Sequence, residues 1–91
     1  MRYIVYVLFS SKIGRRYIGK TSDLKQRFKD HNGGIVSFTS HGRPWKLLYY
    51  EVFLSKKDAA AEEMFLKSGK GRERLKLLLK DTSSNLSEDH G

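Results

Sequence analysis

The side chains in this sequence that could do chemistry carry oxygen and nitrogen rather than sulfur. The chain has no cysteine, which excludes disulfides and thiolate metal sites. Its three histidines, His31, His41 and His90, are scattered and show no metal-ligand spacing. Any metal ion must therefore be a hard cation that is held by oxygen.

The sequence also contains a possible nucleotide-binding motif. Residues 14–21, Gly-Arg-Arg-Tyr-Ile-Gly-Lys-Thr, match the G-x-x-x-x-G-K-[ST] pattern of a nucleotide-binding loop. Such a loop needs flexible backbone amides turned toward a phosphate, but the interior of this segment is bulky and strand-prone. The corresponding fold also needs several parallel strands joined by long crossovers, which a chain of 91 residues with three predicted strands does not supply.

Positive charge is concentrated in most of the chain. The formal net charge is +8, but residues 1–80 hold all 18 Lys and Arg against seven of the ten acidic residues, a net charge of +11. A field of that sign attracts polyanions without choosing among sequences, so nucleic acid is the first partner to consider. Charge alone is equally compatible with a basic protein that has no such partner.

The length predicts one domain, because the chain is too short to divide into two parts that each bury a core. We expect residues 1–80 to form it and residues 81–91 to be a disordered acidic tail. No stretch approaches the ~20 apolar residues that span a bilayer, and no small-residue cleavage site follows the first apolar run. We therefore expect a cytoplasmic protein.

Three segments are predicted to form strands, at residues 3–9, 15–19 and 45–53, with a loop at 35–44 before the third. If the first turn centres on Ser11 and Lys12, Tyr6 pairs with Tyr17 in an antiparallel hairpin. Two phenols then share one face of the sheet. A slip of one residue in this register would send the two rings to opposite faces.

The first predicted helix begins at a cap on Thr21 or Ser22 and ends at residues 32–34. Arg27 and His31 fall on nearly the same side of it as the apolar stripe that begins with Leu24. A guanidinium beside a core-facing stripe needs a partner.

Ser55 and Asp58 form a capping box that predicts a second helix, which runs to about Lys67. On this helix Glu63 is the better candidate for facing inward, whereas Glu62 is turned away by about 100°. Two glycines, at 69 and 71, are predicted to break the chain before a short basic helix over residues 72–80.

Taken together, these segments resemble the GIY-YIG nuclease family. The triplet Ile-Val-Tyr at 4–6, followed by Tyr-Ile-Gly at 17–19, is similar to the two strand motifs that name the family, although the first triplet lacks its glycine. The segments GKTSDLKQRFKDHN, PWKLLYYEVF and AAAEEMFLKSGKGRERLK resemble its first helix, third strand and acid-bearing helix. The resemblance covers about residues 2–80 and is strongest to the short free-standing bacterial branch.

The resemblance implies an α+β fold, in which helices flank a small three-stranded antiparallel sheet. It also implies a metal-dependent endonuclease that hydrolyses DNA phosphodiester bonds, directed by DNA structure such as a branch or damage rather than by sequence. A role in DNA repair or recombination would follow. We expect no membrane association and no obligate protein partner.

The resemblance also implies roles at five matching positions. Tyr17 would activate the attacking water, Tyr6 would orient the nucleophile and substrate, and Arg27 would contact the scissile phosphate. Glu63 would bind one Mg²⁺ or Mn²⁺ ion, and His31 occupies an ancillary position. Some family members use an asparagine beyond the metal-binding helix, where this chain offers only Asn85, which we do not assign.

This chemistry depends on positive charge, because a phosphodiester transition state gathers negative charge on its oxygens. Tyrosine has a pKa near ~10 in model peptides, so as a general base it needs nearby cations that favour phenolate. The candidates for contact with the nucleic acid are Arg15, Arg16, Lys20, Lys67, Lys70 and Arg72.

Simpler interpretations remain for each residue. Strand tyrosines commonly only pack, as we expect of Tyr3, Tyr49 and Tyr50. Arg27 could extend to water, and Glu63 could pair with Lys67 four residues later. The alternative functions are a non-catalytic nucleic-acid-binding module on the same fold, which the missing asparagine favours, and a structural or interaction protein.

Overall fold

The computed structural model describes residues 2–82 of the chain. In chain order, its elements are strand β1 (Tyr3–Ser10), strand β2 (Arg15–Thr21), helix α1 (Leu24–Asn32), 3-10 helix η1 (Ser37–Gly42), strand β3 (Lys46–Phe53), helix α2 (Lys56–Lys67) and helix α3 (Gly69–Leu78). None of the helices among these residues is long and apolar enough to cross a membrane.

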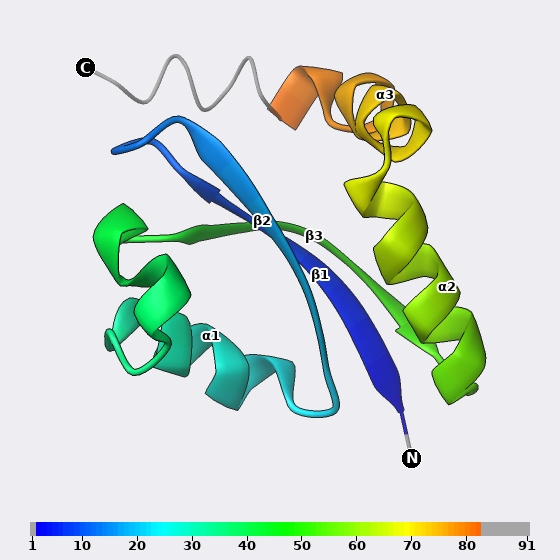
Figure 1. The fold of residues 1–91 in the computed structure, drawn as a ribbon, viewed down its shortest axis with the longest axis horizontal. Helices are drawn as coiled ribbons and strands as arrows, with labels where there is room; N and C mark the ends of the chain where they lie inside the picture. Colours follow the sequence, from blue (N-terminus) through cyan, green and yellow to red (C-terminus); the bar gives the residue numbers. More distant parts are fainter. Residues whose placement is uncertain (1, 83–91) are drawn as a thin grey trace.

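The strands form one antiparallel sheet in the order β2-β1-β3, so β1 is the central strand. Helix α1 and η1 cover one face of this sheet, and α2 and α3 cover the other (Figure 1). The predicted α+β fold with three antiparallel strands is confirmed. Coverage on both faces explains why β1 is an uninterrupted apolar run rather than an alternating one.

Each face of β1 contributes to its own hydrophobic cluster. Val5 and Val7 pack with Leu66 of α2 and with α3, while Tyr6 and Leu8 pack with residues of the other layer. Tyr3 and Tyr49 pack against the first cluster, as the sequence predicts. Tyr50 does not, because it is 53% exposed on the edge strand β3.

The register of the first hairpin differs from the predicted one by two residues. Tyr6 lies opposite Gly19, and Tyr17 lies opposite Leu8. The turn spans four residues, 11–14, and closes at Gly14 with φ of 63°, a conformation that L-residues rarely adopt. Side chains alternate with a period of two, so this shift leaves Tyr6 and Tyr17 on the same face.

The helix starts follow their capping side chains. Asp23, rather than Thr21 or Ser22, caps α1 by accepting a hydrogen bond from the Gln26 amide at 3.0 Å. The Thr21 hydroxyl instead accepts a hydrogen bond from the Asp23 amide at 3.1 Å. Ser55 caps α2 by accepting from the Asp58 amide at 3.3 Å, as predicted. The segment predicted as a loop at 35–44 contains η1.

The predicted chain break at the two glycines is wrong, because both belong to the first turn of α3. Ser68 caps this helix by accepting from the Gly71 amide at 3.2 Å. A Cβ on Gly71 would overlap the Phe65 carbonyl oxygen, whereas a Cβ on Gly69 would meet nothing within 4 Å. Gly71 therefore permits the close approach of two helices.

The structure describes only the first two residues of the predicted acidic tail. Asp81 and Thr82 are still helical, and the rest of it, residues 83–91, lies outside the described residues.

Gly71 and Gly69 provide a matched pair of stability variants. We expect Gly71→Ala to lower the free energy of unfolding by about 1–3 kcal/mol, because the added methyl group forces α3 away from the end of α2. Gly69→Ala should leave stability unchanged or slightly higher. Urea unfolding followed by circular dichroism measures both, and equal midpoints for Gly71→Ala and the wild type would contradict this packing.

Candidate active site

Tyr6 and Tyr17 lie on the same face of the sheet with their ring centroids 6.3 Å apart and tilted by 39°. Gly19 makes room for both rings, because a Cβ there would overlap the Tyr6 hydroxyl and lie 3.0 Å from Tyr17 Cε1. Tyr6 is 1% exposed, whereas Tyr17 is half-buried. The glycine of β2 thus has a packing role in the tyrosine pair.

A chain of buried hydrogen bonds extends from Tyr6 through α1 to η1. The Tyr6 hydroxyl lies 2.8 Å from His31 Nε2, and His31 Nδ1 lies 2.8 Å from Thr39 Oγ1. All three side chains are at most 1% exposed. The sequence placed His31 beside the apolar stripe but gave no reason to single out Thr39, which lies in a segment predicted as a loop.

The partner of the Arg27 guanidinium is the Tyr6 hydroxyl. Its guanidinium lies within hydrogen-bonding reach of that oxygen. Burial raises the pKa of Tyr6, and the Arg27 hydrogen bond offsets part of that rise, so Tyr6 is a neutral phenol near neutral pH. Tyr6, Arg27 and His31 are therefore one hydrogen-bonded group.

His31 is held in its neutral form. Burial, followed by the nearby Arg27 charge, lowers the pKa of His31 from its ordinary value of 6.5. On acidification the unfolded chain takes up this proton before the folded chain does. Stability from this residue is therefore present above about pH 6.5 and is lost as the pH falls through the lower folded-state pKa.

We expect the urea midpoint of the wild type to fall between about pH 7 and pH 5, mainly through His31. The exposed His41 is the matched control, and His41→Gln should keep the wild-type slope. His31→Asn should start from a lower stability and show a flatter slope in this window. If His31→Asn and the wild type lost stability in parallel, the buried histidine would not be the cause.

Glu63 lies on α2, in the layer that covers the opposite face of the sheet. Its side chain is 21% exposed, and its Oε2 accepts a hydrogen bond from Lys67 Nζ at 3.3 Å. Burial is the main cause of the raised Tyr6 pKa, and the negative charge of Glu63 adds to it. Glu63 therefore lies within electrostatic range of the hydroxyl that Arg27 contacts.

The expectation that Glu62 turns away from the protein is wrong. Its side chain is only 16% exposed and accepts from Arg74 Nη1 at 2.9 Å. A hydrogen bond from Glu51 of β3 lowers the pKa of Glu62, and burial raises that of Glu51. Both glutamates flank the buried stripe of α2. Glu62 faces β3, and Glu63 pairs with Lys67 one turn later.

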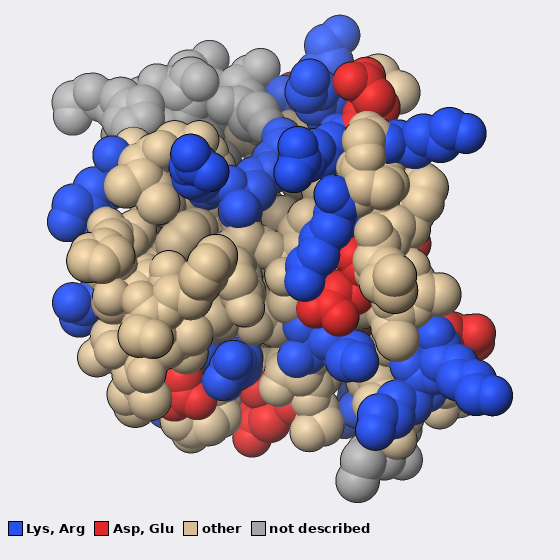
Figure 2. Space-filling view, in the orientation of Figure 1, with Lys and Arg blue, Asp and Glu red and all other residues tan. Residues whose placement is uncertain are grey.

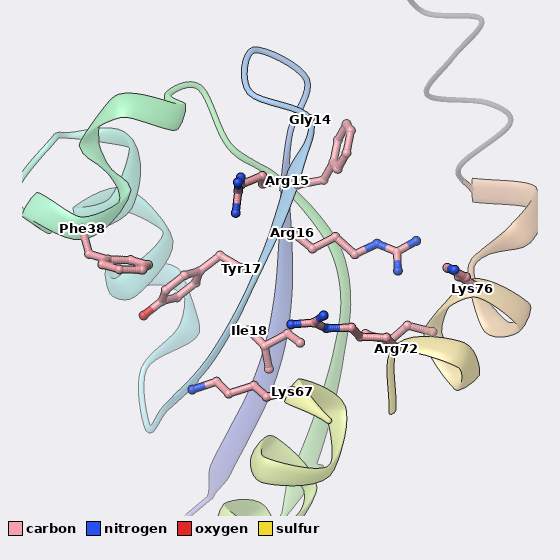
Figure 3. Close-up of a pocket in the computed structure, with 11 residues that line it drawn as sticks. Gly14, Arg15, Arg16, Tyr17, Ile18, Phe38, Lys67, Arg72 and Lys76 are labelled. Atoms are coloured by element: carbon pink, nitrogen blue, oxygen red, sulfur yellow. The ribbon is translucent and has the colours of Figure 1, made fainter. Parts of the chain in front are cut away.

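A groove of about 660 Å³ crosses the edge strand β2. Tyr17 and Phe38 lie on one side of the strand, and Arg16 and Arg72 on the other (Figure 3). Lys and Arg side chains gather between the β1–β2 hairpin and α3 on the face shown in Figure 2. The cationic residues that line the groove are Arg15, Arg16, Lys67, Arg72 and Lys76.

Four of the six predicted contact residues line this groove, whereas Lys20 and Lys70 do not. Six lining residues were not predicted as site residues, among them Lys76 and Phe38. Lys76 follows Arg72 by one helical turn, a spacing that could have revealed it. Phe38 is 83% exposed with its ring centroid 6.0 Å from that of Tyr17, and its position in a predicted loop gave no signal.

The side chains that could bind a metal ion permit only a site with a single protein carboxylate. The described residues contain no group of three or more His, Cys, Asp and Glu side chains that could hold a metal ion. Glu63 is a single carboxylate, which fits Mg²⁺ because that ion keeps several waters and takes phosphate oxygens as further ligands. Such an ion would compete with Lys67 for the carboxylate. Asn85 lies outside the described residues.

Comparison with known proteins gives consistent matches over most of the chain. A family model described as the GIY-YIG catalytic domain matches residues 2–76. A UPF0213 protein of Clostridium perfringens is 33% identical over 87 residues, which are 94% of this chain and 89% of that protein. A UPF0213 protein of Streptococcus pyogenes serotype M5 is 46% identical over 57 residues, 62% of each chain.

One solved structure is also similar. The solution NMR structure of the UPF0213 protein BH0048 from Bacillus halodurans superposes with a TM-score of 0.55 at 33% sequence identity. The match covers 86% of this chain and 85% of the other.

Proposed function

Because this chain belongs to the GIY-YIG catalytic domain family, whose members are typically nucleases, we propose that it is a metal-dependent DNA endonuclease. The observation that supports the proposal is that charged and polar groups from different layers interact with the Tyr6–Tyr17 pair. The Tyr6–Tyr17 pair lies on the hairpin, Arg27 reaches it from α1, and Glu63 acts on it from α2.

The groove supports a nucleic-acid substrate. Its five cationic side chains come from β2, α2 and α3, and Tyr17 lies among its lining residues. Lys and Arg in such a groove bind phosphates whatever the base sequence. The exposed Phe38 beside Tyr17 offers an apolar ring surface to the same substrate. These features support a preference for DNA structure over DNA sequence, as in repair or recombination.

The two tyrosines have different parts in the proposed reaction. The Tyr6 hydroxyl is buried and engaged by His31 and Arg27, so it orients groups and does not exchange protons with solvent. Tyr17 is half-buried and lines the groove, so its hydroxyl meets the substrate and serves as general base. Arg15 and Arg16, its neighbours in β2, line the same groove and supply positive charge that attracts the phosphates of the substrate.

Arg27 and Glu63 complete the proposed charge balance. Arg27 donates hydrogen bonds to the scissile phosphate and opposes the negative charge that develops there. Glu63 would hold one Mg²⁺ ion, which acts as a Lewis acid when bound. Tyr6 keeps Arg27 in place through their hydrogen bond.

Supercoiled plasmid tests the proposal. We expect purified protein to convert it to nicked or linear DNA with Mg²⁺ or Mn²⁺ and to leave it intact with EDTA. Double-stranded, single-stranded, flapped and branched oligonucleotides then define the preferred structure. Failure to cut any of these with either ion would contradict the endonuclease proposal.

The Lys67–Glu63 ion pair favours one alternative function, a nucleic-acid-binding module without catalysis. In that case Glu63 only forms the ion pair with Lys67, and only the cationic groove has a function. A module of this kind would bind DNA with an affinity that falls steeply as the salt concentration rises. It would not cleave DNA with any divalent cation.

A further inference from the structure

Thr39, whose hydroxyl contacts His31 Nδ1, has no role in the function proposed above. We infer that Thr39 is a positioning residue, which fixes the His31 proton on Nδ1 and thereby holds the Tyr6 hydroxyl as a hydrogen-bond donor to His31. The inference rests on the proposed function for its catalytic consequence, but the hydrogen-bond direction itself is independent of catalysis.

The Thr39 hydroxyl has one proton and two neighbouring hydrogen-bond partners. Thr39 Oγ1 lies 3.3 Å from the Val36 carbonyl oxygen, to which it donates its only proton. The same oxygen lies 2.8 Å from His31 Nδ1 and has lone pairs left to accept with. His31 Nδ1 must therefore carry the proton of that hydrogen bond.

The Tyr6 hydroxyl, at the other end of this chain of hydrogen bonds, assigns the same tautomer. A guanidinium only donates, so the Tyr6 oxygen accepts from Arg27. The proton of Tyr6 then needs an acceptor, and His31 Nε2 lies 2.8 Å away. A neutral imidazole has one N–H, so a bare Nε2 requires the proton on Nδ1. Both ends of the chain assign the same tautomer, and the lowered His31 pKa keeps the ring neutral.

Hydrogen bonds hold the main chain of Thr39 in place as well as its side chain. Its carbonyl oxygen accepts from Trp45 Nε1 at 2.8 Å, and Trp45 is 5% exposed. Asn32, the residue after His31, accepts from the Trp45 amide at 2.6 Å and donates to the Trp45 carbonyl at 3.1 Å. The end of α1, η1 and the start of β3 therefore form one rigid support for the His31 ring.

The consequence for Tyr6 is a defined polarity. Because its proton points to His31, its oxygen presents only lone pairs toward Arg27 and the tyrosine pair. Without Thr39, the Nε2–H tautomer becomes available, and the Tyr6 proton turns toward Arg27, which weakens the hydrogen bond that keeps Arg27 in place.

Three variants test the inference. Thr39→Val removes the acceptor for Nδ1–H at nearly constant volume, and Thr39→Ser keeps it. Ser40→Ala is the matched control, because Ser40 makes a similar hydroxyl bond in η1, to the Ser37 carbonyl at 2.9 Å. Proton–nitrogen correlation spectra of histidine-labelled protein report the tautomer, with the His31 signals identified from their absence in His31→Asn.

We expect Nδ1–H for His31 in the wild type, Thr39→Ser and Ser40→Ala, and a population of Nε2–H in Thr39→Val. We expect the cleavage rate of Thr39→Val to fall by about 10-fold, as for other residues that orient a site histidine, with recovery in Thr39→Ser. An Nε2–H tautomer in the wild type overturns the inference, and so does a Thr39→Val variant with unchanged tautomer and rate. A wild type that shows Nδ1–H but cleaves nothing would contradict the endonuclease proposal instead.

Discussion

Tyr17→Phe is expected to lower the cleavage rate by about 100-fold or more, the typical contribution of a general base, and to leave affinity for DNA almost unchanged. The variant removes one hydroxyl from a groove-lining ring and keeps the ring contacts with His31, Phe38 and Trp45. Folding and groove charge are therefore preserved while the proposed proton acceptor is lost.

Single-turnover cleavage and fluorescence anisotropy with the same oligonucleotide separate the two effects. Tyr50→Phe is the control, because that phenol is also partly exposed but belongs to the edge strand β3. A Tyr17→Phe variant that cleaves at the wild-type rate would exclude Tyr17 as the base. A variant that loses binding and cleavage together would point to a role in substrate binding.

Glu63→Gln is expected to abolish cleavage that depends on Mg²⁺ while raising affinity for DNA in the absence of metal. The substitution keeps the shape of the side chain but removes the proposed metal ligand and one negative charge beside Lys67. The released Lys67 adds to the cationic lining of the groove, so binding without metal should tighten.

The neighbouring carboxylate provides the control for this variant. Glu62→Gln lies on the same helix, but Glu62 interacts with Arg74 and Glu51 on the other flank. We expect it to keep cleavage and its dependence on Mg²⁺, after correction for any loss of folded protein measured by circular dichroism. If Glu62→Gln lost cleavage and Glu63→Gln kept it, the metal ligand would have been assigned to the wrong glutamate.

The strands and most of the helices could be predicted because their signals are local. The apolar run of β1 and the Ser55 cap of α2 each depend on a few adjacent residues. The face shared by Tyr6 and Tyr17 was also predictable, since an error of two residues in register does not change the face. Gly71 was misinterpreted, because its role depends on the end of α2 in space.

The supporting residues of the site were harder to predict than its candidate catalytic residues. Tyr17, Arg27 and Glu63 match a known pattern, but Thr39 and Phe38 lie in a segment without apolar periodicity. Thr39 is recognisable only when η1 is seen against the end of α1. The position of Glu62 likewise depends on how α2 rotates over β3, which helical spacing alone does not determine.

We propose that a divalent cation on Glu63 lies next to the Tyr6–Tyr17 pair when DNA is bound. The most direct test is paramagnetic broadening of amide signals by Mn²⁺ in the Tyr17→Phe variant with an oligonucleotide. We expect the signals of Gly19 and Glu63 to broaden first and the Glu63→Gln substitution to abolish this effect. Broadening centred on Glu51 and Glu62, or broadening that persists in Glu63→Gln, would contradict it.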